Sequence, residues 1–418
     1  MFTIIGKYST ATIMTDNADE SVISQIYTMV NSPAINNNPV IMPDTHAGKG
    51  AVIGFTMRML DKVIPNTIGV DIGCGMLNAA VGSPRLDPIL ADAAVRRVVP
   101  TGFNVHGSEH ISLSTLDRLT YSRRLYFSRS LSVPFDSYAD IFKRVGIDTF
   151  YALRSLGTLG GGNHFIEFGT HNERTFITIH TGSRNFGLKV ATHHQKVAQS
   201  PDALNPELTR GVKIVGLKAL HGRGEISGRE LGERIAALNK PAQKTATGLE
   251  YLEGQPLNQY LYDMYAAQEY ARINRKCILD SICIALELVP QLTIESVHNY
   301  IDPDDQIIRK GAIAANEGQF VIIPISRTFG TLIGMGKGNA AWNNSAPHGA
   351  GRVMSRSQAK KLVSQEDATA HMQSAGVYSS FDPPDEDDLA YRGGEEIMAL
   401  IEPTVQYLYT IEPFLNIK

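Results

Sequence analysis

The sequence has little cysteine, a single tryptophan and almost no imbalance of charge. Its three cysteines, Cys74, Cys277 and Cys283, form no disulfide framework, which favours a reducing, cytoplasmic setting. Lys and Arg total 39 against 42 Asp and Glu, a net charge of −3. This balance excludes a protein that binds polyanions through its overall charge, so any nucleic-acid site must be a local basic patch.

Long apolar runs are also missing. The most apolar segment, residues 277–292, is interrupted by Asp280 and Glu287 and is too short to cross a bilayer. Residues 1–20 carry no basic stretch ahead of an apolar one, so we expect neither a signal peptide nor a membrane partner. No repeat and no linker divides the chain, which predicts a single domain over residues 1–418.

Helix-like and strand-like segments alternate along the chain. Apolar alternation predicts strands in four blocks, at residues 2–15, 40–80, 151–182 and 292–335. Helical spacing predicts a helix at 16–31 that Asp16 caps, helices over most of 185–290, and a helix at about 351–372. Such alternation is typical of a mixed α and β fold.

Metal-capable or nucleophilic side chains stand beside glycine or small residues, next to apolar strands. Glycine at a strand end lets the backbone turn tightly, so its neighbour is presented from a rigid base. The segments are MPDTHAGKG (42–50), GVDIGCGM (69–76), LGTLGGGNHFIEF (156–168), ITIHTGSRNFG (177–187) and NSAPHGAGRVMSR (344–356), to which we add ESVHNY (295–300).

The turn GVDIGCGM places Asp71 and Cys74 three residues apart. A carboxylate and a thiolate suit one side of a metal site, and softness alone favours zinc. His164, His180 and His298, each at or near the end of an apolar strand, are candidates to complete the site. The alternative is that Cys74 is a small buried hydrophobe and that each histidine is a satisfied core residue, the commoner case for a single histidine.

His348 stands in SAPHGAGRVMSR, ahead of the predicted helix and close to Arg352 and Arg356. Free backbone N–H groups and the positive end of a helix form an anion site, where a histidine can bind or attack a phosphate. The alternative is a capping loop with two solvated arginines. Further phosphate-binding candidates, each more often a surface charge when taken alone, are Lys49, Arg184, Arg309, Lys310 and Arg327.

Seven segments in order resemble the RtcB family of GTP- and manganese-dependent RNA ligases: PDTHAGKGAVIG, GVDIGCGM, LGTLGGGNHFIE, HTGSRNFG, VHNY, RKGA and SAPHGAGRVMSR. Several long motifs in one order make the resemblance specific. It runs from residue 43 to Lys418, with no motif at 82–155 or 188–290. It implies a single α+β domain of β-sheets packed face to face, flanked by helices, with a central metal cleft.

The resemblance also implies roles for individual residues. Asp71 is similar to the ligand of one manganese ion, Cys74 to a thiolate that bridges two, His164 and His180 to ligands of the first ion, and His298 to a ligand of the second. His348 matches the nucleophile that takes GMP from GTP. The implied nucleotide contacts are Asn163, Phe165, Glu167, Ser326, Gly349, Ala350, Gly351, Tyr391 and Lys418. The implied phosphate or RNA contacts are Arg184, Arg309, Lys310, Arg327 and Arg352, with basic clusters near residue 96 and at 121–129.

The family's reaction joins an RNA 3′-phosphate or 2′,3′-cyclic phosphate end to a 5′-hydroxyl end, in tRNA splicing or RNA repair. The implied cofactors are GTP and two manganese ions per chain. The implied partners are tRNA-like or damaged RNA and an archease-like activator.

Two departures from the family pattern are visible. Many members read PGSMG where this chain reads PISRTFG, and many end in Lys-Gly where Lys418 ends this sequence. Neither touches Asp71, Cys74 or the key histidines, so we expect a competent catalyst. Two alternatives stay open: a metal-dependent phosphodiesterase acting on cyclic phosphates, which needs neither His348 nor Lys418, and a non-catalytic RNA- or nucleotide-binding homologue.

Overall fold

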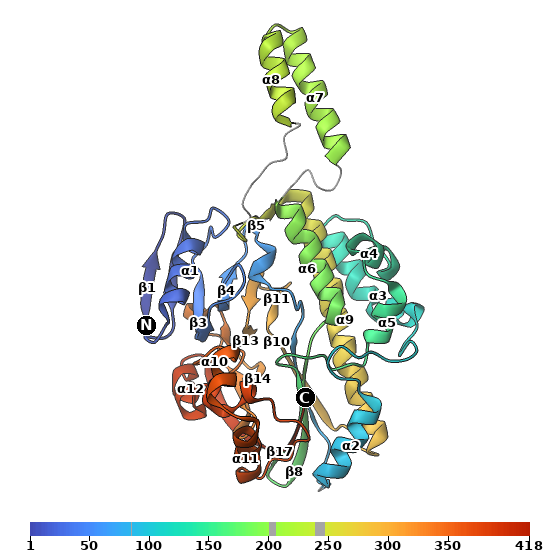
Figure 1. The fold of residues 1–418 in the computed structure, drawn as a ribbon, viewed down its shortest axis with the longest axis vertical. Coiled ribbons are helices and arrows are strands. Elements are labelled where there is room, and N and C mark those ends of the chain that lie inside the picture. Colours follow the sequence, from blue (N-terminus) through green and yellow to red (C-terminus); the bar gives the residue numbers. More distant parts are fainter. Residues whose placement is uncertain (85, 200–205, 239–246) are drawn as a thin grey trace.

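The structure is a computed structural model that describes residues 1–84, 86–199, 206–238 and 247–418 (Figure 1). Its first large sheet has six strands in the order β1-β2-β3-β4-β12-β11. These are β1 (Phe2–Ile5), β2 (Thr10–Ile13), β3 (Val40–His46), β4 (Ile53–Arg58), β12 (Ile307–Lys310) and β11 (Asn299–Ile301). Helix α1 (Glu20–Val30) packs on β1 and β2 through the buried side chains of Val22 and Ile26.

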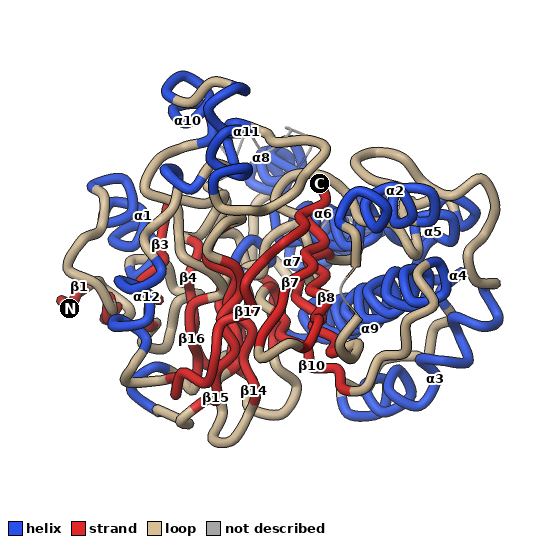
Figure 2. The backbone as a smooth tube through the Cα atoms, turned by 90° about the horizontal axis from the view of Figure 1, so that it is seen from below, coloured by secondary structure: helices blue, strands red, loops and turns tan. Residues whose placement is uncertain are grey.

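The second large sheet has seven strands in the order β10-β6-β8-β7-β17-β15-β14 (Figure 2). These are β10 (Leu292–Val297), β6 (Gly75–Ala80), β8 (Arg174–Thr181), β7 (Phe165–His171), β17 (Val405–Ile417), β15 (Gly330–Gly336) and β14 (Phe320–Ser326). The two edge strands meet, since the Ile322 N–H donates to Ser296 Oγ at 3.1 Å. The sheet therefore curls nearly into a barrel. Two small sheets pair β13 (Ala312–Ala314) with β16 (Ser345–Pro347), and β5 (Lys62–Val63) with β9 (Leu252–Glu253).

The long helix α9 (Gly254–Ala285) organises the helical side of the molecule, because α2 (Pro88–Val98), α3 (Leu113–Ser130), α6 (Arg184–Gln199) and strand β8 all pack against it (Figure 1). Helices α7 (Pro206–Gly222) and α8 (Gly228–Leu238) form a hairpin that projects from the body in Figure 1. Two further helices of this half are α4 (Tyr138–Val145) and α5 (Thr149–Ser155). The short and C-terminal helices are η1 (Pro65–Thr67), η3 (Ala340–Trp342), α10 (Arg356–Leu362), α11 (Gln365–Ser374), η4 (Pro384–Glu386), η5 (Asp388–Ala390) and α12 (Gly394–Ile401).

The expectation of a mixed α and β fold is confirmed, but two helix boundaries were wrong. Helix α1 begins at Glu20 and Asp16 does not cap it. The helix expected at about 351–372 is two helices, α10 and α11, because Ser355 and Ser364 each build a capping box that starts a new helix. The predicted helices of 185–290 fall in part on residues 200–205 and 239–246, which lie outside the described residues.

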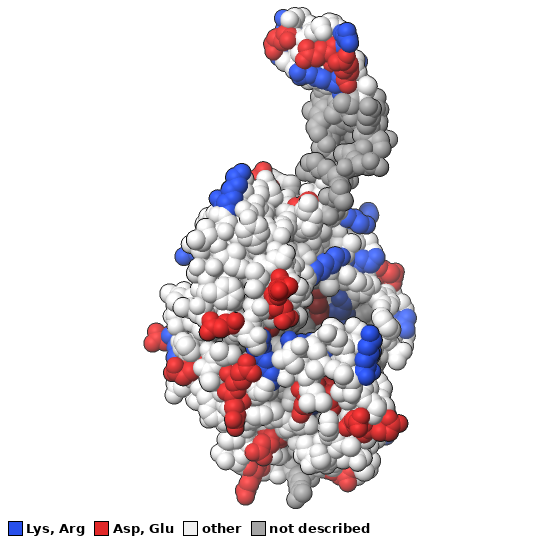
Figure 3. Space-filling view, turned by 60° about the vertical axis from the view of Figure 1, so that its left-hand side comes forward, with Lys and Arg blue, Asp and Glu red and all other residues white. Residues whose placement is uncertain are grey.

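Charge is mixed over the surface, as the composition predicts. Figure 3 shows acidic and basic side chains interspersed on one face, with several basic ones around a recess. The basic cluster at 121–129 is not wholly exposed, since Arg124 is fully buried and forms an ion pair with Asp117. Among the described residues no helix combines the length and the apolar character needed to cross a membrane.

Candidate metal centre and nucleotide pocket

Five side chains from four separate segments meet at one end of the seven-stranded sheet. Cys74 ends a tight turn in which its N–H donates to the Asp71 carbonyl at 3.2 Å, directly before β6. Strand pairing aligns Met76 of β6 with His180 of β8, and Gly75 with Val297, the last residue of β10 before His298. His164 precedes β7, which pairs with β8 on its other side. Register, not closeness in sequence, brings these residues together.

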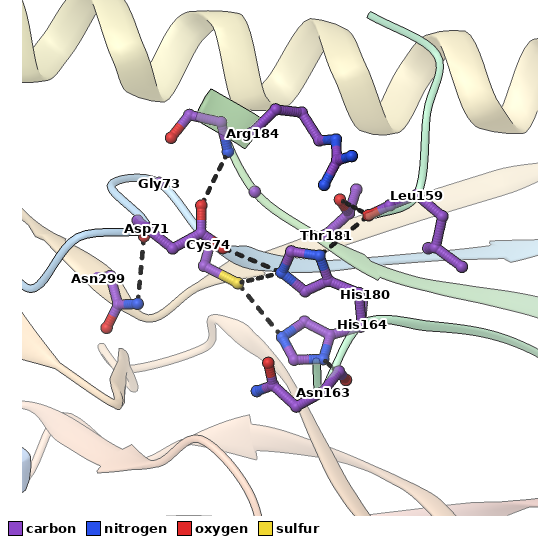
Figure 4. A network of polar contacts seen from close by, with 12 residues as sticks. Asp71, Gly73, Cys74, Leu159, Asn163, His164, His180, Thr181, Arg184 and Asn299 are labelled. Atoms are coloured by element: carbon purple, nitrogen blue, oxygen red, sulfur yellow. Dashed lines mark hydrogen bonds and ion pairs between the residues drawn. The ribbon is translucent and has the colours of Figure 1, made fainter. Parts of the chain in front are cut away.

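The five side chains, which we call the metal cluster, approach one another closely, and Figure 4 shows four of them, Asp71, Cys74, His164 and His180. The Cys74 Sγ lies 3.4 Å from His180 Nε2 and 3.5 Å from His164 Nε2. His164 Nε2 lies 2.9 Å from Asp71 Oδ2, and His180 Nε2 lies 3.4 Å from His298 Nε2. The donor atoms form two groups whose members all lie within 4.8 Å, one of Asp71, Cys74 and His164 and one of Cys74, His180 and His298. Cys74 belongs to both groups.

Backbone contacts fix the orientation of the histidines. The Nδ1 of His164 lies 2.9 Å from the Leu159 carbonyl, and the Nδ1 of His180 lies 3.0 Å from the Asn163 carbonyl. A carbonyl only accepts, so each Nδ1 carries a proton and each Nε2 faces the other side chains of the metal cluster. This is the outer arrangement that metal-binding histidines ordinarily have.

Helix α9 holds the turn that carries Asp71 and Cys74. The buried Arg275 guanidinium donates to the carbonyls of Gly73 (2.9 Å) and Thr181 (3.0 Å), so it ties the turn to the end of β8. Gly182 allows the close approach, because a Cβ there would lie 2.2 Å from Asp71 Oδ1. The ligand-bearing turn therefore rests on a rigid support.

Burial sets the protonation of the metal cluster. It raises the pKa of the Cys74 thiol well above its usual value, an effect that the Asp71 carboxylate strengthens. It also lowers the pKa of His180 and His298 well below the ordinary range. Burial is the largest single influence and would raise the pKa of Asp71, but the contacts of its carboxylate with His164, Cys74 and His180 together outweigh burial, so the pKa is lowered. Neutral imidazoles, a carboxylate and a thiol that a cation can deprotonate are a donor set that fits a transition metal.

His348 lies beside the metal cluster and has a carboxylate partner. Its ring centroid is 4.8 Å from that of His298, and its Nδ1 is 2.8 Å from Oδ2 of Asp44, which is fully buried in β3. The Asp44 carboxylate accepts from Nδ1–H, so the Nε2 lone pair is free. Asp44 is the functional residue that the sequence reasoning missed, although its segment MPDTHAGKG was among those singled out.

No helix end lies directly behind His348, contrary to the expectation. Residues 349–355 form a loop, and Ser355 itself caps α10. The loop folds onto β3 at Gly351, where φ is +74° and a Cβ would lie 2.7 Å from the Asp44 backbone. The anion site predicted from a helix dipole is therefore replaced by a glycine-rich loop that presents His348.

A cavity of about 380 Å³ joins His348 to the metal cluster, and we call it the nucleotide pocket. Its wall includes Asp71, Cys74, His180 and His298 on one side and Gly349, Ala350, Gly351 and Arg352 on another. The side chains expected to contact a nucleotide line it as well: Asn163, Phe165, Glu167, Ser326, Tyr391 and Lys418. The structure thus brings all the expected metal and nucleotide residues to one place except His164, which joins from the adjoining wall.

Glu167 is a buried acid that has one hydrogen-bond partner among the described residues. Thr331 Oγ1 donates to its Oε1 at 2.8 Å. Burial raises the pKa of Glu167 to about 8, so the side chain is mostly protonated at neutral pH. A ligand with N–H donors can reverse this, since donors stabilise the ionised form.

Comparison with known proteins identifies the family to which the chain belongs. The family model described as tRNA-splicing ligase RtcB matches residues 25–418. The chain belongs to the RtcB family. It is similar to the RNA-splicing ligase RtcB of Escherichia coli K12, at 29% identity over 94% of this chain and 93% of the relative. It is also similar to the tRNA-splicing ligase RtcB of Aeropyrum pernix, at 26% identity over 82% and 79%.

A third relative is the RNA-splicing ligase RtcB of Mycobacterium tuberculosis, at 28% identity over 84% of this chain and 89% of the relative. The resemblance drawn from seven motifs is therefore confirmed over most of the chain. The protein is an enzyme of the RtcB RNA ligase family.

Two of the five cations expected at phosphates or RNA are held inside the fold by other partners. Arg309 is fully buried and forms ion pairs with Asp302 and Asp305. Lys310 donates to three backbone carbonyls, those of Lys49, Ala51 and Asn66, at 2.7–3.0 Å. Both side chains act as internal braces, so the expectation that they contact RNA does not agree with the structure.

The other three expected cations lie nearer the centre. Arg327 and Arg352 line the nucleotide pocket, although Arg327 already donates to Asp382 at 2.9 Å. Arg184 donates to Thr158 Oγ1 and to the Gly102 carbonyl, each at 2.9 Å, and packs against Gly160. Of this set, only Arg352 lies in the loop that follows His348.

One further residue escaped the sequence reasoning. Glu386 accepts from Tyr391 Oη at 2.6 Å and pairs with Lys418 Nζ at 3.0 Å. It therefore orients two side chains expected to contact the nucleotide. The acidic loop in which it lies, DPPDEDD, was visible in the sequence but carried no specific signal.

Proposed function

We propose that the protein joins RNA 3′-phosphate or 2′,3′-cyclic phosphate ends to 5′-hydroxyl ends, with GTP and manganese, through GMP held covalently on His348. The observation that carries the proposal is the position of His348. Its Nε2 is free because Asp44 holds Nδ1, and its ring lies 4.8 Å from the His298 ring at the wall of the nucleotide pocket.

Two manganese ions would be held by the metal cluster, one by Asp71, Cys74, His164 and His180 and the other by Cys74 and His298. The presence of Cys74 in both donor groups supports two ions that share one thiolate, while the same grouping places His180 beside His298 and apart from Asp71 and His164. Bound cations would neutralise the charge that develops on phosphoryl oxygens.

The chemistry assigned to His348 begins with attack of Nε2 on the α-phosphorus of GTP. A P–N bond forms, the bond to the β-phosphate oxygen breaks, and pyrophosphate leaves. The imidazole becomes cationic, and the Asp44 carboxylate, 2.8 Å from Nδ1, stabilises that charge. The same contact keeps the ring a good leaving group for the following step.

GMP then passes from His348 to the RNA. An oxygen of the RNA 3′-phosphate attacks the guanylate phosphorus, the P–N bond breaks, and an RNA(3′)pp(5′)G end forms. The RNA 5′-hydroxyl attacks the 3′-phosphorus, GMP leaves, and a phosphodiester remains. A cyclic phosphate would first be opened by water to a 3′-phosphate. A role for an archease-like activator stays a prediction.

A direct test is ligation of two oligoribonucleotides, one with a 3′-phosphate and the other with a 5′-hydroxyl. We expect GTP- and manganese-dependent joining, and no joining when the first strand ends in a 3′-hydroxyl. Opening of a 2′,3′-cyclic phosphate without GTP and without joining would instead show a phosphodiesterase. Binding without either reaction would show a non-catalytic homologue.

Removal of the bridging thiol should strip the metal cluster. For Cys74→Ala we expect manganese affinity to fall by about 100-fold or more, because Cys74 belongs to both donor groups. Titration calorimetry with Mn²⁺ measures this. Cys277→Ala is the matched control, since Cys277 is also buried but lies in α9 outside the cluster. Equal affinity in the two variants would contradict the assignment.

The raised pKa of Glu167 predicts a pH dependence of guanine binding. Its pKa is about 8 in the free protein, and guanine N–H donors favour the carboxylate, so affinity should rise with pH and level off above 8. Between pH 6 and pH 8 we expect GMP binding to tighten by about 50-fold by this linkage. Calorimetry on Glu167→Gln measures how GMP affinity changes with pH through all groups other than Glu167, and this change is subtracted from that of the wild type. An equally steep pH dependence in the variant would contradict the role of Glu167.

A further inference from the structure

A second cavity adjoins the metal cluster and does not include His348 in its wall. It has a volume of about 550 Å³ and includes His164 in its wall. It shares Arg356, Glu386 and Lys418 with the nucleotide pocket. We call it the strand cavity. Its position means that a ligand inside it would reach the same reacting centre as the nucleotide.

The strand cavity lies between α2, the loop that begins at Thr101, and the segment from α10 to η4. The Gly102 N–H donates to the Gly160 carbonyl at 2.8 Å, which joins that loop to the Gly160–Gly162 turn. Figures 1 and 2 both place the C-terminal end of the chain between α2 and α11, and Lys418 belongs to the cavity wall. Three consecutive glycines leave one wall without side chains, so a polymer backbone can approach it closely.

Cationic side chains outnumber carboxylates in the wall. Arg96, Arg356, Lys360 and Lys418 face Asp385 and Glu386. Arg96 is held in place by Asp92 at 2.9 Å and by the Lys418 carbonyl at 3.0 Å, and its Nη2 has no hydrogen-bond partner among the described residues. The Lys360 side chain is 61% exposed, and its Nζ lies 3.5 Å from Asp385 Oδ1. This ion pair is exposed and long, so it holds Lys360 only weakly. The excess of positive charge suits a phosphodiester backbone.

Two exposed phenylalanines belong to the wall of the strand cavity or adjoin it in sequence. Phe381 belongs to its wall and is 55% exposed, and Phe103, which follows Gly102 of the wall, is fully exposed. A single exposed phenylalanine needs no explanation, but two beside a basic cavity match the composition of single-strand sites. In such sites aromatic rings stack on bases while cations follow the backbone.

We propose that the strand cavity receives the end of an RNA strand, with a base stacked on Phe381 and backbone phosphates bound by Arg96 and Lys360. This inference rests on the proposed function and adds the path by which RNA reaches the metal cluster. The backbone chemistry is common to the 3′-phosphate strand and the 5′-hydroxyl strand, so the experiment has an arm for each.

The test measures binding of two labelled single strands of about ten nucleotides by fluorescence anisotropy. One strand ends in a 3′-phosphate, and the other has a 5′-hydroxyl and a 3′-hydroxyl. We expect Phe381→Ala to weaken binding of at least one strand by about 5- to 100-fold. We expect Lys360→Ala to weaken it by about 5-fold and to reduce the slope of log affinity against log salt by about 1.

Matched controls separate the cavity from general surface effects. Phe320→Ala removes an exposed phenylalanine from strand β14. Lys361→Ala removes a lysine that is the neighbour of Lys360 in sequence but does not line the cavity. Neither should change RNA binding. If Phe381→Ala fails to fold, Phe103→Ala replaces it, because a fully exposed side chain contributes little to the folded core.

Guanylylation by GTP needs no RNA and is measured on the same variants. Unchanged guanylylation with weaker RNA binding in the Phe381 and Lys360 variants alone supports the proposal, and the strand affected assigns the end. Unchanged binding of both strands in these variants overturns it. Failure of the wild-type protein to accept GMP would instead refute the proposed function. Guanylylation therefore tests the proposed function, and RNA binding by the variants tests the strand cavity.

Discussion

Replacement of His348 by alanine should abolish covalent guanylylation. With Mn²⁺ and GTP labelled at the α-phosphate, wild-type protein should retain label after denaturation, in a form that acid releases and base does not. In His348→Ala the label should fall by about 10⁴-fold or more, because no other group in the nucleotide pocket combines a free imidazole lone pair with a carboxylate partner.

The same variant allows a sharper experiment. Joining of a preformed RNA(3′)pp(5′)G end to a 5′-hydroxyl end does not use the His348 nucleophile, so His348→Ala should still perform it. Manganese affinity should stay within a few-fold of wild type, since His348 is not in the metal cluster. Labelling of the variant at the wild-type level would refute the assignment of the nucleophile.

The second large effect concerns Asp44. We expect Asp44→Asn to reduce the rate of guanylylation by about 10³- to 10⁴-fold, because an amide can donate to Nδ1 and move the proton to Nε2, which removes the nucleophilic lone pair. The measurement is a single-turnover labelling time course at saturating GTP.

Two controls accompany this prediction. Asp61→Asn changes an exposed aspartate that lines neither the nucleotide pocket nor the strand cavity, and it should leave the rate unchanged. Calorimetry should show manganese binding to Asp44→Asn that matches wild type, which excludes damage to the metal cluster. A rate within tenfold of wild type would mean that Asp44 does not set the tautomer of His348.

The strand cavity gives these two predictions a wider setting. The nucleotide pocket and the strand cavity meet at Arg356, Glu386 and Lys418, so guanylate and RNA would approach the metal cluster from adjoining walls. Glu386 pairs with both Lys418 and Arg356 at this junction. Its burial keeps three charged groups in fixed positions between the two ligands.

Two expectations failed for one physical reason. Arg309 and Lys310 lie in strand β12, in a motif that resembled a phosphate contact, yet ion pairs with Asp302 and Asp305 hold Arg309, and backbone carbonyls accept from Lys310. The direction in which a side chain points from a strand depends on which strands pair with it, and β12 pairs with β4, more than 240 residues earlier. A local motif carries no information about such a partner.

The boundary of the helix after His348 failed for a different reason. Apolar spacing continued through residues 351–372, but hydroxyl side chains at Ser355 and Ser364 offered the backbone local partners and divided the segment. The anion site assigned to a helix end was consequently misplaced, while His348 itself was identified correctly as a residue of the pocket.

The sequence by itself determined the ingredients of the centre. Glycine-rich turns depend on neighbouring residues only, so the segments around Asp71, Cys74, His164 and His348 could be recognised without a structure. Seven motifs in one order identified the family. Only the tertiary structure decided how the ingredients act. Strand register brought His180 and His298 to Cys74, and the folding of the Gly351 loop onto β3 gave His348 its partner Asp44, 304 positions away. Contacts of that range depend on packing of the whole chain, because no local preference of either residue specifies them.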